Sequence, residues 1–150
     1  MLLKEFNEIA RPLLEDPRLQ MLAEYNHHRG KTRLDHVKEV AWLSFLWGKR
    51  FSLDCKAIIR GALLHDLFYY DWLREGPKLH GLRHPDIALK NAMKLTLLTK
   101  KEINIIKRHM WPITVIPPIY KESFLVCIID TFCSTRDYIG SKKNNIQDKL

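Results

Sequence analysis

The stretch from Asp54 to Asp66 constrains the fold of this chain more than any other. Its apolar residues go nearly all the way round a helix, a pattern typical of a helix that is buried on every side. Asp54 can cap the start of this helix, which ends near His65 and Asp66. Gly61 lies four residues before His65, where a small residue leaves room for another helix or a ligand. We therefore expect a central helix that is surrounded by others.

Helix signals continue along the rest of the chain. Thr32 with Asp35, and Thr99 with Glu102, have the spacing of capping boxes, which start helices. No segment alternates like a strand, so the predicted fold is all-α, a single helical bundle. The loops are expected at 27–31, 70–83 and 111–118, where glycine, proline and polar residues interrupt the apolar period. The helices are predicted at about 2–14, 18–25, 32–50, 54–66, 84 onward, 99–109 and 121–138.

Size and composition limit the classes of function. The 150 residues suit one domain, 1–150, with a polar tail at 140–150 that we expect to be mobile. The net charge of +8 favours anionic partners, but no unbroken basic run marks a nucleic-acid tail. Three cysteines without a Cys-x-x-Cys pair favour a reducing, cytoplasmic location. No secretory signal and no apolar run of membrane-spanning length appear, so no membrane partner is expected.

Two aspartates, Asp66 and Asp130, lie in otherwise apolar helical segments. A single histidine on an apolar face is usually a core residue, but a carboxylate is rarely buried without a partner. No lysine or arginine stands beside either aspartate in the sequence. A shared cation therefore fits the two carboxylates together with the histidines that occur at helix ends or inward faces, namely His36, His65, His84 and His109.

The adjacent pair His65-Asp66 indicates how such a centre is arranged. Neighbouring side chains diverge inside a helix but can converge at its end, and the two oxygens of Asp66 can bridge two ions. Imidazole ligands suit Mn, Fe, Ni, Co or Zn, and the carboxylates also admit Mg. Each ion would keep open positions, which is typical of a catalytic site. The predicted ligands are His36, His65, Asp66 and Asp130 for one ion, and Asp66, His84 and His109 for the other.

This ordered set, with Gly61-Ala-Leu-Leu-His65-Asp66 as its central signature, resembles the HD-domain superfamily of metal-dependent phosphohydrolases. The resemblance covers about residues 30–137, and the two further histidines resemble its two-metal branch, which includes cyclic-dinucleotide phosphodiesterases. It implies an HD-like helical bundle that hydrolyses a phosphate ester, of a nucleotide or cyclic nucleotide, by a metal-bridging hydroxide. Asp66 would bridge the ions and orient this nucleophile.

The sequence departs from the family pattern directly after the His-Asp pair. Leu67, Phe68 and Tyr69 stand where many members have glycine and lysine, and the Gly-Tyr-Pro motif of one cyclic-dinucleotide class is missing. The resemblance therefore does not identify the substrate of this protein. Two other functions stay open: an HD-type di-iron oxygenase, which uses the same ligands, and a non-catalytic nucleotide-binding domain.

Another group must then bind the phosphate of a small phosphorylated substrate, which we expect to be a nucleotide. Lys31 and Arg33, just before His36, are the first candidates, and Arg74 and Lys78 are the second. Each of them also fits a solvated surface charge.

Three further expectations concern histidine, tryptophan and assembly. His80 is a candidate proton donor or alternative ligand, or else an exposed loop residue. Trp111 is expected to wall the pocket or stack on a base, whereas Trp42, Trp47 and Trp72 are expected in the core. The sequence leaves a homodimer open.

Overall fold

The computed structural model describes residues 1–27 and 30–147, with side chains placed through residue 140 outside the gap. Over this range the protein is all-α, as predicted, with one isolated bridge between Asn26 and Thr32. The elements are α1 (Leu2–Leu14), α2 (Pro17–Gln20), the 3-10 helix η1 (Met21–Glu24), α3 (Arg33–Arg50), α4 (Cys55–Leu64), α5 (His80–Leu95), α6 (Lys100–Arg108) and α7 (Lys121–Gln147).

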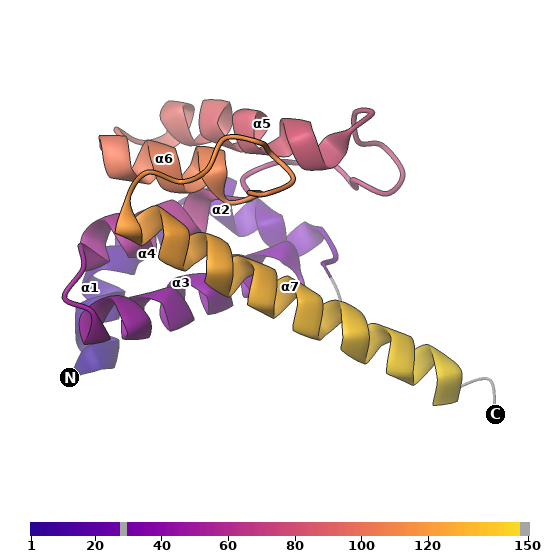
Figure 1. The fold of residues 1–150 in the computed structure, drawn as a ribbon, viewed down its shortest axis with the longest axis horizontal. Helices are drawn as coiled ribbons and strands as arrows, with labels where there is room; N and C mark the ends of the chain where they lie inside the picture. Colours follow the sequence, from indigo (N-terminus) through magenta and orange to yellow (C-terminus); the bar gives the residue numbers. More distant parts are fainter. Residues whose placement is uncertain (28–29, 148–150) are drawn as a thin grey trace.

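Helix α4 lies at the centre, which confirms the expectation from its apolar pattern. It packs against α1, α3, α5, α6 and α7, and its residues are buried from Ala57 to Leu64, apart from Arg60. Gly61 permits the close approach of α6, because a Cβ at this position would lie 2.8 Å from side-chain atoms of Ile105. In Figure 1, α5 and α6 lie above α4, α3 lies below it, and α7 crosses in front and extends past the other helices.

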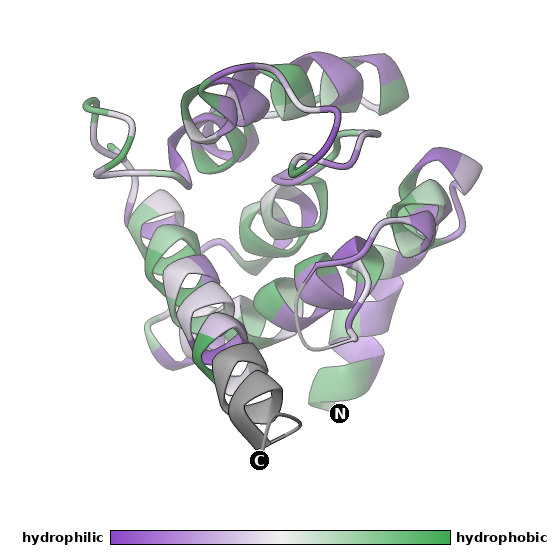
Figure 2. Ribbon diagram, turned by 90° about the vertical axis from the view of Figure 1, so that its right-hand side faces the viewer, coloured by the Kyte–Doolittle hydropathy of each residue, from purple (hydrophilic) through white to green (hydrophobic). Residues whose placement is uncertain are grey.

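The predicted caps are present and fix where helices begin. Thr32 accepts a hydrogen bond from the backbone N–H of Asp35 at 3.1 Å, and Asp35 accepts one from the N–H of Thr32 at 3.0 Å. Thr99 and Glu102 form the same reciprocal pair at the start of α6. In Figure 2 apolar residues occur where the helices face one another and also along α7, where Ile128 is 61% and Phe132 is 56% exposed. No helix within the described ranges has both the length and the apolar character needed to cross a bilayer.

The structure corrects several predicted boundaries. Helix α5 begins at His80 rather than at His84, because only one turn precedes Pro85 and its missing N–H removes a single helical bond. The segment predicted as a helix at 18–25 is divided between α2 and η1. Helix α7 continues to Gln147 rather than ending near 138, and residues 148–150 of the predicted tail lie outside the described residues.

Two tryptophans that we expected in the core are exposed. Trp47 is 49% exposed and Trp72 is 37% exposed, whereas Trp42 packs against the core as expected. Trp47 stacks on Phe51 at the end of α3, and Trp72 lies in the loop before α5. The indole ring is large enough to pack with one face while the other remains in solvent. The presence of a tryptophan in the sequence therefore does not by itself predict that the residue is buried.

Candidate metal centre and adjoining pocket

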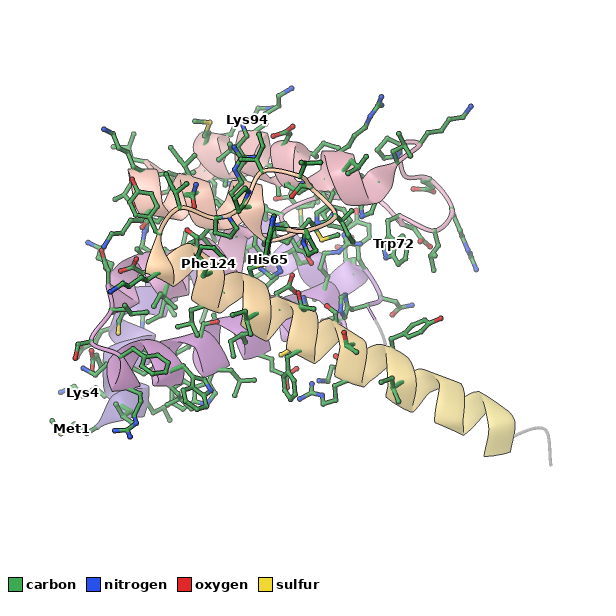
Figure 3. All side chains as sticks on the ribbon, in the orientation of Figure 1. Met1, Lys4, His65, Trp72, Lys94 and Phe124 are labelled. Carbon is green, nitrogen blue, oxygen red and sulfur yellow. The ribbon has the colours of Figure 1, made fainter. Side chains whose placement is uncertain are left out.

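The six predicted ligands come together at one place in the core, although they lie on five different helices or their ends. His36 is in the second turn of α3, and His65 and Asp66 directly follow α4. His84 lies one turn into α5, His109 caps α6, and Asp130 lies in the middle of α7. Each of the six residues is at most 8% exposed. Figure 3 labels His65 near the middle of the molecule, beside α7.

Asp66 divides the cluster into two groups, one on each carboxylate oxygen. Its Oδ2 lies 3.7 Å from His36 Nε2 and 3.5 Å from His65 Nε2. Its Oδ1 lies 3.1 Å from His84 Nε2 and 3.4 Å from His109 Nε2. A further potential ligand group, His65 with His109 and Asp130, joins the two sides of the cluster.

Asp130 completes the first group from the side of α7. Its Oδ1 lies 2.9 Å from His36 Nε2 and 3.4 Å from His65 Nε2. The thiol of Cys127, one turn earlier on α7, donates to the carbonyls of His109 and Trp111 at 3.2 and 3.3 Å. Through this contact, the helix that carries Asp130 is joined to the end of the helix that carries His109.

Backbone carbonyls orient three of the histidine rings. Nδ1 of His65, His84 and His109 must be the protonated nitrogen, because each faces a carbonyl oxygen that can only accept. In a neutral ring, the Nε2 lone pair then points into the cluster, as metal-binding histidines require. The accepting carbonyls belong to Ala62 (2.6 Å), His80 (3.3 Å) and Ile106 (2.7 Å), in that order.

The arrangement of these Nε2 atoms fits a cation. Nε2 of His84 lies 2.7 Å from Nε2 of His109. The lone pairs of these two nitrogens would repel each other unless a proton or a metal ion lies between them. Nε2 of His65 is buried and has no hydrogen-bond partner among the described residues. The buried histidine and aspartate groups are therefore compatible with binding one or more metal ions.

The charges inside the cluster are strongly coupled. Burial raises the pKa of Asp66, but His65, His109 and His84 outweigh burial and hold that pKa well below its ordinary value. The pKa of Asp130 is lowered in the same way, by His65 and His36 against burial. Burial lowers the pKa of His65, and the fields of Asp66 and Asp130 overcome this and raise it to about 9. Both carboxylates are thus anionic at neutral pH, and without a metal a proton on His65 supplies part of the balancing charge.

A pocket of about 710 Å³ opens beside the cluster, within the size range of small-molecule sites. Asp66, His84, His109 and Asp130 contribute to its wall, so a bound molecule would reach the cluster directly. The other lining residues include His27, Arg33, Phe68, Trp72, Leu73, Leu79, His80, Met110, Trp111, Ile113, Thr131, Ser134 and Thr135.

The residues expected to bind substrate are distributed unevenly around this pocket. Arg33 and Trp111 line it. Lys31 does not, because its ammonium pairs with Glu39 at 2.7 Å and with Asp137 at 3.4 Å. Arg74, whose side chain is 85% exposed, and Lys78 do not line the pocket either. The structure therefore brings one of the four expected cations to the pocket.

His80 lies in the pocket wall rather than in an exposed loop. Its Nδ1 is 3.0 Å from the hydroxyl of Tyr70, and its ring stacks on His84 with the centroids 4.6 Å apart. Burial and the neighbouring His84 lower the pKa of His80 to about 4. Its ring is thus neutral at pH 7 and can act as a hydrogen-bond donor. His80 belongs to none of the potential ligand groups found among the described residues.

Sequence reasoning missed several pocket residues. His27 stacks on His36 with ring centroids 3.9 Å apart, and Phe68 lies directly after the helix end that carries Asp66. On α7, Ser134 lies one turn beyond Asp130, a spacing that predicts contact between them, and its Oγ lies 3.5 Å from Asp130 Oδ1. Thr131 and Thr135, on the same helix face, were not expected to line the pocket. The path of the loops that carry His27 and Phe68 has no comparable signal.

The helical architecture and the clustered histidines and aspartates are compatible with an HD-like fold. Comparisons with family models, with curated proteins and with solved structures found no match. The function must therefore be argued from the geometry of the centre and of its pocket.

Proposed function

We propose that this protein is a metal-dependent phosphohydrolase of the HD type, which hydrolyses the ester bond of a small phosphorylated substrate. One observation carries the proposal: the two oxygens of Asp66 each face a separate pair of histidine Nε2 atoms at the base of an open pocket. A carboxylate in this position can bridge two ions. A bridged pair of ions is typical of enzymes that attack phosphorus.

The cluster suits divalent ions, namely Mn, Fe, Ni, Co, Zn or Mg. His36, His65, Asp66 and Asp130 would hold one, and Asp66, His84 and His109 would hold the other. Ions bound there supply Lewis-acid charge for a phosphoryl group and lower the pKa of a coordinated water. The net charge of two divalent ions and two carboxylates is about +2, which favours an anionic substrate.

The residues of the pocket have separate tasks. Asp66, which lines the pocket, would contribute a ligand to each half of the centre and orient the attacking water. His80, neutral at pH 7, can donate a hydrogen bond to the phosphate or to the leaving oxygen. The hydroxyl of Tyr70 fixes the orientation of this ring through Nδ1.

The test combines metal content with hydrolysis. Protein purified without a chelator is expected to hold close to two equivalents of divalent metal and to release phosphate from a panel of phosphomonoesters and phosphodiesters. Asp66→Asn should lose most of the metal and at least about a hundredfold of the rate, because one carboxylate serves both sites. Asp86→Asn makes the same change on the exposed side of α5 and should retain both.

The alternative functions give different results. Bound iron with oxygen uptake and no phosphate release would replace the proposal with oxygenase chemistry. Saturable nucleotide binding without turnover would indicate a binding domain. A wild-type protein that takes up no metal after incubation with Mn or Fe would refute the proposal, and the six residues would then be a buried polar network.

A further inference from the structure

Away from the carboxylates of the centre, the pocket is walled mainly by rings and aliphatic groups. Phe68, Trp72 and Trp111 contribute aromatic rings, and Leu73 and Ile113 add aliphatic side chains. Leu73 is 74% exposed and Ile113 is 60% exposed, although both are apolar. An apolar part of a bound molecule would cover them and remove that surface from water.

Three rings in this wall form a stacked column. The ring of Trp72 lies 5.4 Å from the ring of His80 at an interplanar angle of 19°, and His80 lies 4.6 Å from His84 at 16°. The column therefore runs from the loop before α5 to a candidate metal ligand. Figure 3 shows Trp72 on that loop, to the right of His65. A planar group can join this column at Trp72, whose side chain is 37% exposed.

Positive charge is scarce in the same wall. Among the described lining residues, Arg33 is the one lysine or arginine. Its guanidinium donates to the carbonyls of Phe68 at 2.6 Å and Tyr70 at 3.1 Å, lies 3.7 Å from the centroid of the Phe68 ring, and is 1% exposed. Arg33 therefore holds the wall in place and is not free to bind a ligand. Among the described residues, the charge that attracts an anion would therefore come from the centre.

Uncharged polar groups occur on the part of the wall that α7 provides. Thr131, Ser134 and Thr135 have the i, i+3 and i+4 spacing of one helix face and line the pocket. Ser134 Oγ lies 3.5 Å from Asp130 Oδ1, so this face adjoins the centre. Hydroxyls here can bond to alcohol groups of a substrate without favouring a second charge.

We infer that the pocket takes a monoester of a single phosphate, whose alcohol carries one planar, uncharged ring system. The inference rests on the proposed function and narrows its substrate class. Nucleoside 5′-monophosphates and aryl phosphates share this chemistry. A second or third phosphate would lie against apolar walls where the described residues provide no lysine or arginine besides the engaged Arg33 to compensate its lost hydration, which disfavours nucleoside triphosphates and cyclic dinucleotides.

The experiment compares kcat/KM, in the metal-loaded enzyme, for adenosine 5′-monophosphate, naphthyl phosphate, glycerol 3-phosphate and adenosine 5′-triphosphate. Both ring-bearing monoesters should exceed ring-free glycerol phosphate, and the triphosphate should be the poorer nucleotide. The higher kcat/KM of the two, adenosine monophosphate or naphthyl phosphate, then shows whether the pocket suits a nucleoside or an aryl group. Trp72→Ala should lower kcat/KM for the ring-bearing monoesters about tenfold more than it lowers kcat/KM for glycerol phosphate. Trp47→Ala, at another stacked and half-exposed tryptophan, is the matched control and should change neither.

Two further measurements keep this inference separate from the proposed function. Leu73→Lys adds a cation to the wall and should raise the rate for adenosine diphosphate relative to the monophosphate about threefold. In metal-free protein, adenosine and naphthol should still bind, detected by ligand-observed NMR, and Trp72→Ala should weaken that binding about tenfold. Equal rates with glycerol phosphate, a preference for the triphosphate, or no ring binding in the metal-free protein would each overturn the inference. Absence of hydrolysis of every ester, with ring binding intact, would overturn the proposed function alone.

Discussion

The proton on His65 should make the metal-free protein lose stability as the solution becomes alkaline. In the folded chain burial lowers the pKa of His65, but Asp66 and Asp130 outweigh burial and raise it from 6.5 to about 9. A raised pKa contributes stability that is fully present below the unfolded value, near 6.5, and is lost as the pH rises through the folded value. The free energy of unfolding should therefore decrease between about pH 6 and pH 9.

The size of the loss follows from the shift. A rise from 6.5 to about 9, at 1.36 kcal/mol per pH unit, corresponds to about 3 kcal/mol, and His65 is fully buried, so solvent screening does not reduce it. For a chain of this length that corresponds to a fall of roughly 10 °C in Tm. Urea unfolding in the presence of a chelator, at pH steps from 6 to 9, measures it directly.

His65→Asn serves as the control, because it removes the titrating group while other groups that titrate in this range are retained. Subtracting its pH profile from that of the wild type should leave the loss of about 3 kcal/mol. Bound metal displaces the proton, so the decline should disappear in the metal-saturated wild type. Parallel pH profiles for the metal-free wild type and His65→Asn would refute this account of the charges.

Two further predictions concern the framework around the centre. Gly61→Ala should destabilise the fold by about 1–3 kcal/mol, because the new Cβ would meet three atoms of Ile105 within 2.9 Å; an unchanged urea midpoint would show that α4 and α6 can separate at no cost. Arg33→Met should lower the free energy of unfolding by about 3 kcal/mol through the loss of two charged hydrogen bonds to Phe68 and Tyr70, and a thermal melt equal to wild type would contradict that role.

The sequence by itself determined the helical framework. The all-round apolar pattern of residues 54–66 placed α4 at the centre, because a helix without a polar face must be covered on every side. The capping pairs at Thr32 and Thr99 located two helix starts to the residue, because an N-cap bond is a local interaction. The local pattern at Pro85 did not give the correct helix start, because α5 begins one turn before the position that the proline indicates.

The sequence also indicated which side chains belong together at the centre. Asp66 and Asp130, each in an apolar segment of the sequence, required partners, and inward histidines at helix ends could provide them. That argument identifies a shared, buried environment but not its geometry. The division of the cluster between the two oxygens of Asp66 depends on how five helices cross, which no local pattern specifies.

Only the tertiary structure decided what surrounds the centre. The positions of Lys31, Arg74 and Lys78 away from the pocket, and of Trp72 within its wall, follow from the paths of loops and from long-range ion pairs. Polar and aromatic side chains fit either a surface or a pocket, so their identity does not choose between the two. The helices follow from short-range patterns of apolarity and capping, whereas the pocket is the space that remains after those helices have packed.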